Sequence, residues 1–187
     1  MSNREFFVRC WEDEYPVFVK VLKAVPPDKL DYRPHLTSRS AAEIAWIQVV
    51  EKRCWVEMIE TGKINWKVPA PPKALSDIIT AYEKAHAELA PRLNRIDDKT
   101  WNEKPTQFVV DGHVYCETAF GHMFWLGLFD AIHHRGQLSV YIRAMGGSVP
   151  AIYGPSGDDD RDLHQPLLNL EGLVAAKPLT GRSVTAW

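Results

Sequence analysis

Apolar and polar positions alternate with the period of an α-helix in four long segments of the chain. In each segment the apolar side chains recur three or four residues apart, the spacing that places them on one face of a helix. Two of the segments begin with a serine, Ser2 or Ser40, followed three residues later by a glutamate, which is the pattern of a capping box. We therefore expect helices at about residues 2–24, 40–61, 75–94 and 118–145.

The residues between and within these segments predict where helical structure is interrupted. Pro16 lies inside the first helical pattern and predicts a kink or break near Tyr15. The linker at residues 67–72 is too dense in proline to be helical. Asp111-Gly112 lies between β-branched and aromatic residues, which indicates a short β-hairpin.

These elements predict an all-α fold built as an antiparallel four-helix bundle. The short hairpin interrupts the helices, and residues 147–187, rich in glycine and proline, form an irregular C-terminal extension. A chain of 187 residues is the usual size of one domain, so we expect residues 1–187 to form a single unit.

Composition excludes several classes of protein. The chain has 22 Lys and Arg against 24 Asp and Glu, a net charge of -2, which argues against a nucleic-acid-binding protein. Its three cysteines form no close pair, which fits a reducing compartment and excludes a disulfide framework. The start of the chain has no apolar signal segment, and the longest apolar-leaning stretch, residues 119–132, is too short for a bilayer. We expect a cytoplasmic protein that binds neither nucleic acid nor membranes.

The last predicted helix carries one stripe of unusual composition. At about 100° per residue, its members lie within about 40° of one line along the helix. A face that begins apolar and turns polar in mid-helix is typical of a core face that opens onto a polar pocket. From the apolar to the polar end the stripe reads Met123, Leu126, Asp130, His134, Gln137 and Tyr141.

Asp130 and His134 are four residues apart, so both can reach one divalent cation, with an oxygen and a nitrogen ligand. The same spacing also allows a simple hydrogen bond between the two, and the residues alone leave both interpretations open. His133 projects about 60° to the side of the stripe, at the pocket's margin. Gly136 in mid-helix costs about 1 kcal/mol relative to alanine. It favours a close approach of a neighbouring helix or of the pocket, unless it is incidental.

A third ligand would come from the second predicted helix. Glu51 offers a hard oxygen donor there, and Gln48 is a weak ligand but a good hydrogen-bond partner. Ordinary solvent exposure is the alternative interpretation for both side chains.

Several runs of the chain closely resemble the DinB/YfiT-like family. They are the run Leu128-Phe129-Asp130-Ala131-Ile132-His133-His134-Arg135-Gly136-Gln137-Leu138, then Tyr141-Ile142-Arg143, residues 146–150 and the run Tyr153-Gly154-Pro155-Ser156-Gly157-Asp158, together with Ser40-Ala41-Ala42-Glu43-Ile44-Ala45-Trp46 in the second helix. The resemblance implies a four-helix bundle with up-down-down-up connectivity. It also implies a divalent metal, often nickel or zinc, on three histidines, one from helix two and two from helix four. Relatives include hydrolases and S-transferases that use a low-molecular-weight thiol, and homodimers are common.

The family's three-histidine site is incomplete in this chain. The two helix-four ligand positions match Asp130 and His134, and the helix-two position falls on Ile47, which cannot bind a metal. Gln48 lies next to that position, and Glu51 lies one turn further on.

Three hypotheses follow. In the first, the protein is a metal-dependent enzyme, a thiol-dependent S-transferase or a hydrolase, acting on a small molecule between helices two and four. Asp130, His134 and Glu51 would hold the metal, and Ile47, Gln48, His133, Gln137 and Tyr141 would line the pocket. In the second, the bundle binds a small molecule without catalysis because its metal site is degenerate. In the third, the protein is purely structural and Asp130–His134 is a core hydrogen bond.

Overall fold

A computed structural model of the chain describes residues 1–158, and the greater part of the predicted C-terminal extension lies outside the described residues. Four long helices dominate it, and their bounds agree with the expected ones to within two residues. A one-and-a-half-turn helix that the sequence pattern did not predict lies before the hairpin. The helices are α1 (Asn3–Lys23), α2 (Ala41–Thr61), α3 (Leu75–Asn94), the short α4 (Asp98–Glu103) and α5 (Phe120–Ala144).

Both predicted capping boxes are present. The Glu5 main-chain N–H donates to the Ser2 hydroxyl while the Glu5 carboxylate accepts from the Ser2 N–H, and the second pair repeats this at the start of α2. Of the kink or break predicted near Tyr15, the break is absent: α1 is one continuous helix through Pro16. Buried aromatic residues on both sides of this proline, Trp11 and Phe18, hold the helix against the core, and their packing offsets the hydrogen bond that proline cannot donate.

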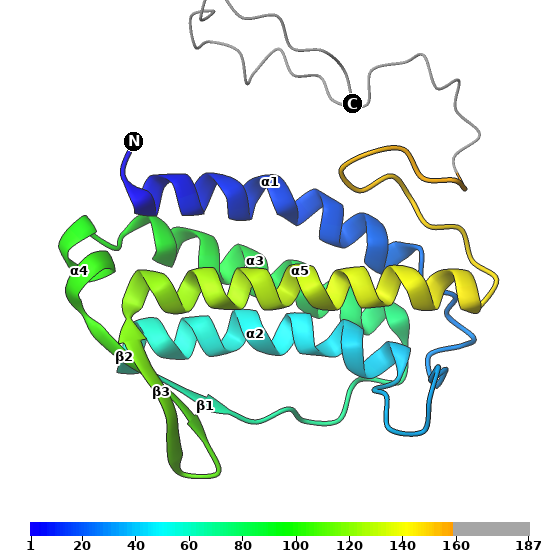
Figure 1. The fold of residues 1–187 in the computed structure, drawn as a ribbon, viewed down its shortest axis with the longest axis horizontal. Helices are drawn as coiled ribbons and strands as arrows, with labels where there is room; N and C mark the ends of the chain where they lie inside the picture. The colour runs from blue at the N-terminus through cyan, green and yellow to red at the C-terminus, as the bar shows by residue number, and fades with distance from the viewer. Residues whose placement is uncertain (159–187) are drawn as a thin grey trace, which may run out of the picture.

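The four long helices lie side by side (Figure 1). Both α1 and α2 pack against α3 on one side and against α5 on the other, so the core is enclosed by all four helices. Aromatic rings fill the end of this core nearest the N-terminus, where Phe7 and Phe124 contact each other and both contact Trp55 and Trp101. The up-down-down-up connectivity implied by the family resemblance remains a prediction.

A three-stranded sheet lies beside α2 and the start of α5 (Figure 1). Its strands are β1 (Lys63–Trp66), β2 (Pro105–Val110) and β3 (His113–Ala119), in the order β1-β2-β3. The predicted hairpin is confirmed as the antiparallel pair β2–β3, and Asp111 and Gly112 at its turn have φ of 48° and 80°. Two positive φ values are what a type I′ turn requires, which explains the Asp-Gly sequence.

Strand β1 was not predicted, and the all-α expectation is therefore incomplete. It follows the left-handed C-cap of α2 at Gly62 and pairs in parallel with β2, with Ile64 opposite Phe108. The signal was short: four residues, Lys63 to Trp66, that alternate polar and apolar before the proline-dense linker. This small sheet becomes one wall of the cavity described below.

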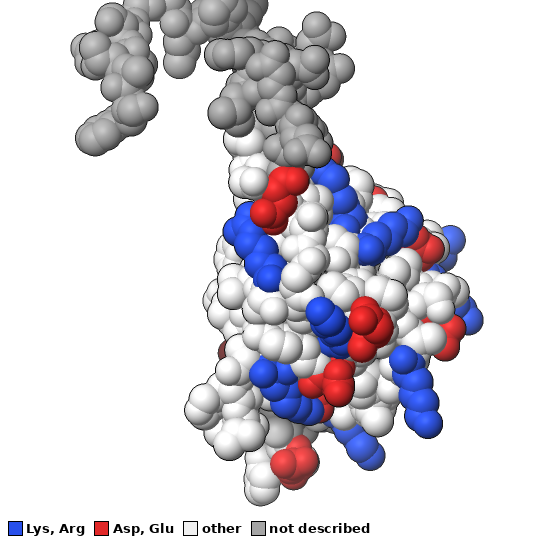
Figure 2. Space-filling view, turned by 90° about the vertical axis from the view of Figure 1, so that its right-hand side faces the viewer, with Lys and Arg blue, Asp and Glu red and all other residues white. Residues whose placement is uncertain are grey.

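A buried ion pair joins α5 to α1, and the segment after α5 contacts it through Tyr153. Arg135 is 1% exposed, its guanidinium contacts the Glu14 carboxylate and the Tyr153 hydroxyl, and it lies over the Phe18 ring. Tyr153 also donates to Glu14, so three side chains from α1, α5 and the following segment form one network. On the face seen in Figure 2, Lys and Arg side chains alternate with Asp and Glu. None of the described helices is long and apolar enough to cross a membrane.

Candidate metal centre and cavity

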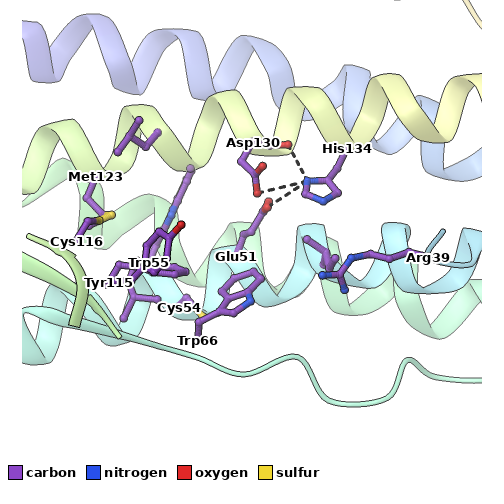
Figure 3. A pocket seen from close by; sticks show the side chains of 15 residues that line it. Arg39, Glu51, Cys54, Trp55, Trp66, Tyr115, Cys116, Met123, Asp130 and His134 are labelled. Carbon is purple, nitrogen blue, oxygen red and sulfur yellow. Dashed lines mark hydrogen bonds and ion pairs between the residues drawn. The ribbon is translucent and has the colours of Figure 1, made fainter. Parts of the chain in front are cut away.

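A cavity of about 450 Å³ opens between α2, α5 and the sheet. Its walls are mostly apolar and aromatic, with Trp55 from α2, Trp66 from β1, Phe108 from β2 and Tyr115 from β3. Its polar end is formed by Glu51, Asp130, His134 and Arg39 (Figure 3). A volume of this size is typical of sites for small organic ligands.

Three potential metal ligands come together at the polar end. Asp130 and His134 project from α5 and Glu51 projects toward them from α2 (Figure 3). The His134 Nδ1 atom lies 3.8 Å from Glu51 Oε1 and 3.5 Å from Asp130 Oδ2. One ligand atom from each residue lies within 4.8 Å of the others, a separation that a single cation can bridge with small side-chain movements. The ligand set predicted from the sequence is therefore brought together by the fold.

Glu51 is the most unusual member of this group. Its side chain is 5% exposed, and neither carboxylate oxygen has a hydrogen-bond partner among the described residues. Burial, reinforced by the negative charge of Asp130, raises the pKa of Glu51 well above its usual range. An unpartnered buried carboxylate is costly for a fold to keep, so an observation of this kind points to a function.

His134 is oriented by its own helix. Its Nδ1 lies 2.9 Å from the main-chain carbonyl oxygen of Asp130, and Nδ1–H donates this hydrogen bond in the metal-free protein; a cation bound at Nδ1 would take the place of that proton. The Asp130 carboxylate is half exposed and sits 3.5 Å away, at the mouth of the cavity. The structural hypothesis required a core hydrogen bond between the two side chains. The shorter contact of His134 Nδ1 is with the main chain, and the two side chains lie 3.5 Å apart.

A second polar cluster lies behind Glu51, inside the bundle. Lys52 is 6% exposed, its Nζ sits over the Trp11 and Tyr82 rings, and it lies 3.5 Å from His86 Nδ1. Burial lowers the pKa of Lys52 to about 7. His86 in turn contacts Glu12 at 3.1 Å and lies between the Trp11 and Tyr15 rings.

Of the residues predicted to line the pocket, Ile47 lines the cavity and four do not. Tyr141 and Gln137 lie on the Asp130 stripe, but each residue of a helix also advances about 1.5 Å along its axis, which carries them roughly 10 to 16 Å beyond Asp130. Gln137 instead meets His133 on the exposed surface at 2.9 Å. Gln48 is buried with an unpartnered amide beside Lys52, on the far side of Glu51.

Several cavity residues were missed by the sequence analysis. Arg39, which precedes the cap of α2, and the sheet residues Trp66 and Tyr115 all line the cavity. Cys54 does so too, but burial raises the pKa of its thiol to about 12, so it is a poor nucleophile at neutral pH. Only the short alternation of Lys63 to Trp66 offered a signal for the β1 wall, and nothing in the local pattern marks Arg39.

Comparison with known proteins agrees with the resemblance. The DinB family profile matches residues 1–164. The uncharacterized protein YrdA of Bacillus subtilis (strain 168) is 22% identical over 160 residues, which cover 83% of this chain and 90% of YrdA. A solved DinB-like protein from Bacillus cereus superposes with a TM-score of 0.65 at 20% identity, covering 80% of this chain and 97% of its own. The DinB-like protein YjoA from B. subtilis gives 0.58 at 19% identity, covering 75% and 91%. Because the family profile matches residues 1–164 of the 187, the protein belongs to the DinB family.

Proposed function

We propose that this protein is a metal-dependent enzyme that acts on a small molecule in the cavity between α2, α5 and the sheet. The observation that carries the proposal is the buried, unpartnered Glu51 carboxylate facing Asp130 and His134. A bound cation would supply the missing partner for Glu51 and would offset the repulsion between the two carboxylates.

The donor set fits a divalent cation. Two carboxylates and one imidazole give two oxygen ligands and one nitrogen ligand. This set differs from the two-histidine, one-glutamate set of catalytic zinc sites by a carboxylate in place of one imidazole. Nickel and zinc are the metals that the family resemblance implies, and the larger share of oxygen also admits Mn²⁺ or Fe²⁺. When bound, such a metal acts as a Lewis acid and lowers the pKa of a bound water or thiol.

The protein's own contribution is positioning and exclusion of water. Trp55, which is 3% exposed, and the partly buried Trp66 and Phe108 line the cavity, and Glu51, Asp130 and His134 lie at its polar end. A substrate held against these walls would present one end to the metal-binding residues Glu51, Asp130 and His134. Hydrolysis and transfer of a group to a low-molecular-weight thiol are the two reactions that the family resemblance implies for such a site.

The test is the response of stability and metal content to Glu51→Gln. Protein purified without an affinity tag is expected to carry close to one ion per chain. After removal of that ion, added Zn²⁺ or Ni²⁺ should raise the free energy of unfolding of the metal-free protein, by about 2.7 kcal/mol at a hundredfold excess over the Kd. Glu51→Gln keeps the side-chain shape without the charge. It should abolish this gain, and the metal-free variant should be at least as stable as the metal-free parent because a buried carboxylate has been removed.

Glu57→Gln is the matched control, since Glu57 lies on the same helix and its carboxylate is exposed and accepts a hydrogen bond from Asn65. It should retain both the metal and the stabilisation. A tag-free parent with no bound metal and no stabilisation by Zn²⁺, Ni²⁺ or Mn²⁺ would contradict the proposal.

A second candidate function is supported by Ile47. This residue is 1% exposed and lines the cavity, at the helix-two position where the family resemblance implies a metal-binding histidine. An apolar residue there favours a bundle that binds a small molecule without catalysis. The metal measurement above separates the two candidates, because stoichiometric metal in the parent excludes a site made non-functional by Ile47.

A further inference from the structure

With a divalent cation bound, the cavity would keep one uncompensated positive charge, that of Arg39. Among its lining residues the charged groups are Glu51 and Asp130 on one side and Arg39 on the other. A divalent cation held by two carboxylates and a neutral imidazole forms a group of zero net charge, so the Arg39 guanidinium would remain as the one full charge facing a ligand.

Arg39 is held in place by its main chain while its side chain is free. The Tyr141 hydroxyl donates a 3.2 Å hydrogen bond to the Arg39 carbonyl oxygen, and Tyr141 is itself buried against Tyr32. In the described part of the chain the Arg39 guanidinium makes no ion pair or hydrogen bond. Nearby Arg33, by contrast, pairs with Glu43 at 2.9 Å.

The guanidinium reaches into the cavity from the N-terminal end of α2, and the ligand group lies beside it (Figure 3). The remaining walls are aromatic and apolar, with Trp55, Trp66 and Phe108 among them. The cavity therefore offers a cationic contact at one end and flat apolar surfaces over most of its length. An arginine fork of this kind binds carboxylates, sulfonates and phosphates with two hydrogen bonds.

We propose that the substrate is an organic anion with a flat apolar body, whose acidic group is bound by Arg39 beside the metal and whose body lies against the aromatic walls. This inference rests on the proposed function only for the presence of a bound metal. Arg39 is the residue that selects for the acidic group, and Trp55, Trp66 and Phe108 select for the flat body.

The test compares two probes of the same shape, 2-naphthylacetate and its neutral amide, by titration calorimetry against Zn²⁺-loaded full-length protein. The acid should bind about fivefold more tightly than the amide, the size of effect expected for an ion pair with a partly exposed arginine. Arg39→Gln should remove this preference while leaving the affinity for the amide unchanged, and Arg39→Lys should retain part of it. Arg95→Gln, which removes an exposed arginine at the end of α3, is the control and should behave as the parent.

Equal affinity for the two probes, a preference that survives Arg39→Gln, or no binding of either probe would each overturn the inference. Its failure is distinguishable from failure of the metal proposal because metal content is measured separately on the same samples. If the parent binds no metal but still prefers the acid, and Arg39→Gln removes this preference, the anion site stands and only the metal proposal is contradicted.

Discussion

At the scale of single residues, the buried polar side chains are where function and stability compete. His86 illustrates this away from the cavity. It lies between two aromatic rings, with Lys52 at Nδ1 and Glu12 at Nε2. Burial, together with the charge of Lys52, lowers the pKa of His86 to about 3.

A lowered pKa in the folded state makes stability depend on pH. The contribution of His86 is fully present above about pH 6.5, its usual unfolded value, and is lost as the pH falls toward 3, because the unfolded chain takes up a proton that the folded chain does not. His86→Phe keeps the stacked ring and cannot take up this proton. Between pH 6.5 and 5 the parent should therefore lose up to about 2 kcal/mol more stability than the variant.

Urea unfolding of both proteins at pH values from 7 to 5 measures this difference, and the change in the gap between the two curves isolates His86 from the other titrating groups. Parallel curves would show that His86 binds protons equally well in both states. His113 is exposed at the hairpin turn, and His113→Phe is the matched control for a histidine-to-phenylalanine substitution outside the core.

At the scale of elements, α5 packs closely against its neighbours at some glycines and not at others. A Cβ on Gly127 would lie 2.5 Å from a ring carbon of Trp55, which is both core and cavity wall. A Cβ on Gly136 would meet nothing within 4 Å. The close approach considered from the sequence for Gly136 is thus wrong, because that part of α5 faces outward, and the close approach occurs instead nine residues earlier.

The two glycines predict opposite effects of the same substitution. Gly127→Ala should lower the free energy of unfolding by about 2 kcal/mol or more, because it must displace the Trp55 ring. Gly136→Ala should raise it by about 0.5 to 1 kcal/mol, since alanine is the better helix former. Thermal or urea unfolding of the two variants measures both changes, and a destabilised Gly136→Ala would contradict the outward-facing environment.

Helices were predictable from the chain because their signals are local. Ser2 and Ser40 each form a capping box with the glutamate three residues later, which identifies the start of the helix. The Asp111-Gly112 pair likewise identifies the hairpin turn. Strand β1 depends on a partner about forty residues away in β2, so its four residues carried no decisive local signal.

The site divides in the same way. Asp130 and His134 share one helix face and were predictable as a pair, and Glu51 completed the set once the fold brought α2 alongside α5. The angular argument failed for Gln137 and Tyr141 because it ignored distance along the helix. Arg39 precedes its helix, where no periodicity applies, and its place in the cavity follows only from the packing of α2 against α5 and the sheet.

At the scale of the whole molecule, the outer face of α5 and the start of α1 carry an aromatic cluster. Phe6 contacts Trp125, and Trp125 contacts Phe129, with ring centroids 5.9 and 5.7 Å apart. Phe129 is 58% exposed and Val140, further along the same face, is 69% exposed. Exposed apolar side chains gathered in this way are typical of an interface between proteins.

We expect a homodimer in which this face meets its own copy. Light scattering coupled to size exclusion should give twice the monomer mass for the parent, and Phe129→Ser should shift the protein to the monomer. Leu36→Ser is the control, because Leu36 is 95% exposed in a connection distant in sequence from both α1's start and α5. A parent that is monomeric at all concentrations would contradict the interface.

The small sheet has one further consequence. The side chains proposed to hold the metal all come from helices whose other faces form the core, whereas much of the wall that a ligand touches comes from strands at the edge of the molecule. Substitutions at Trp66 or Tyr115 would change the shape of the cavity without altering the packing between the long helices. The chemistry of the site and the choice of what enters it can therefore diverge independently during evolution, with the helices conserving the first while the strands vary the second.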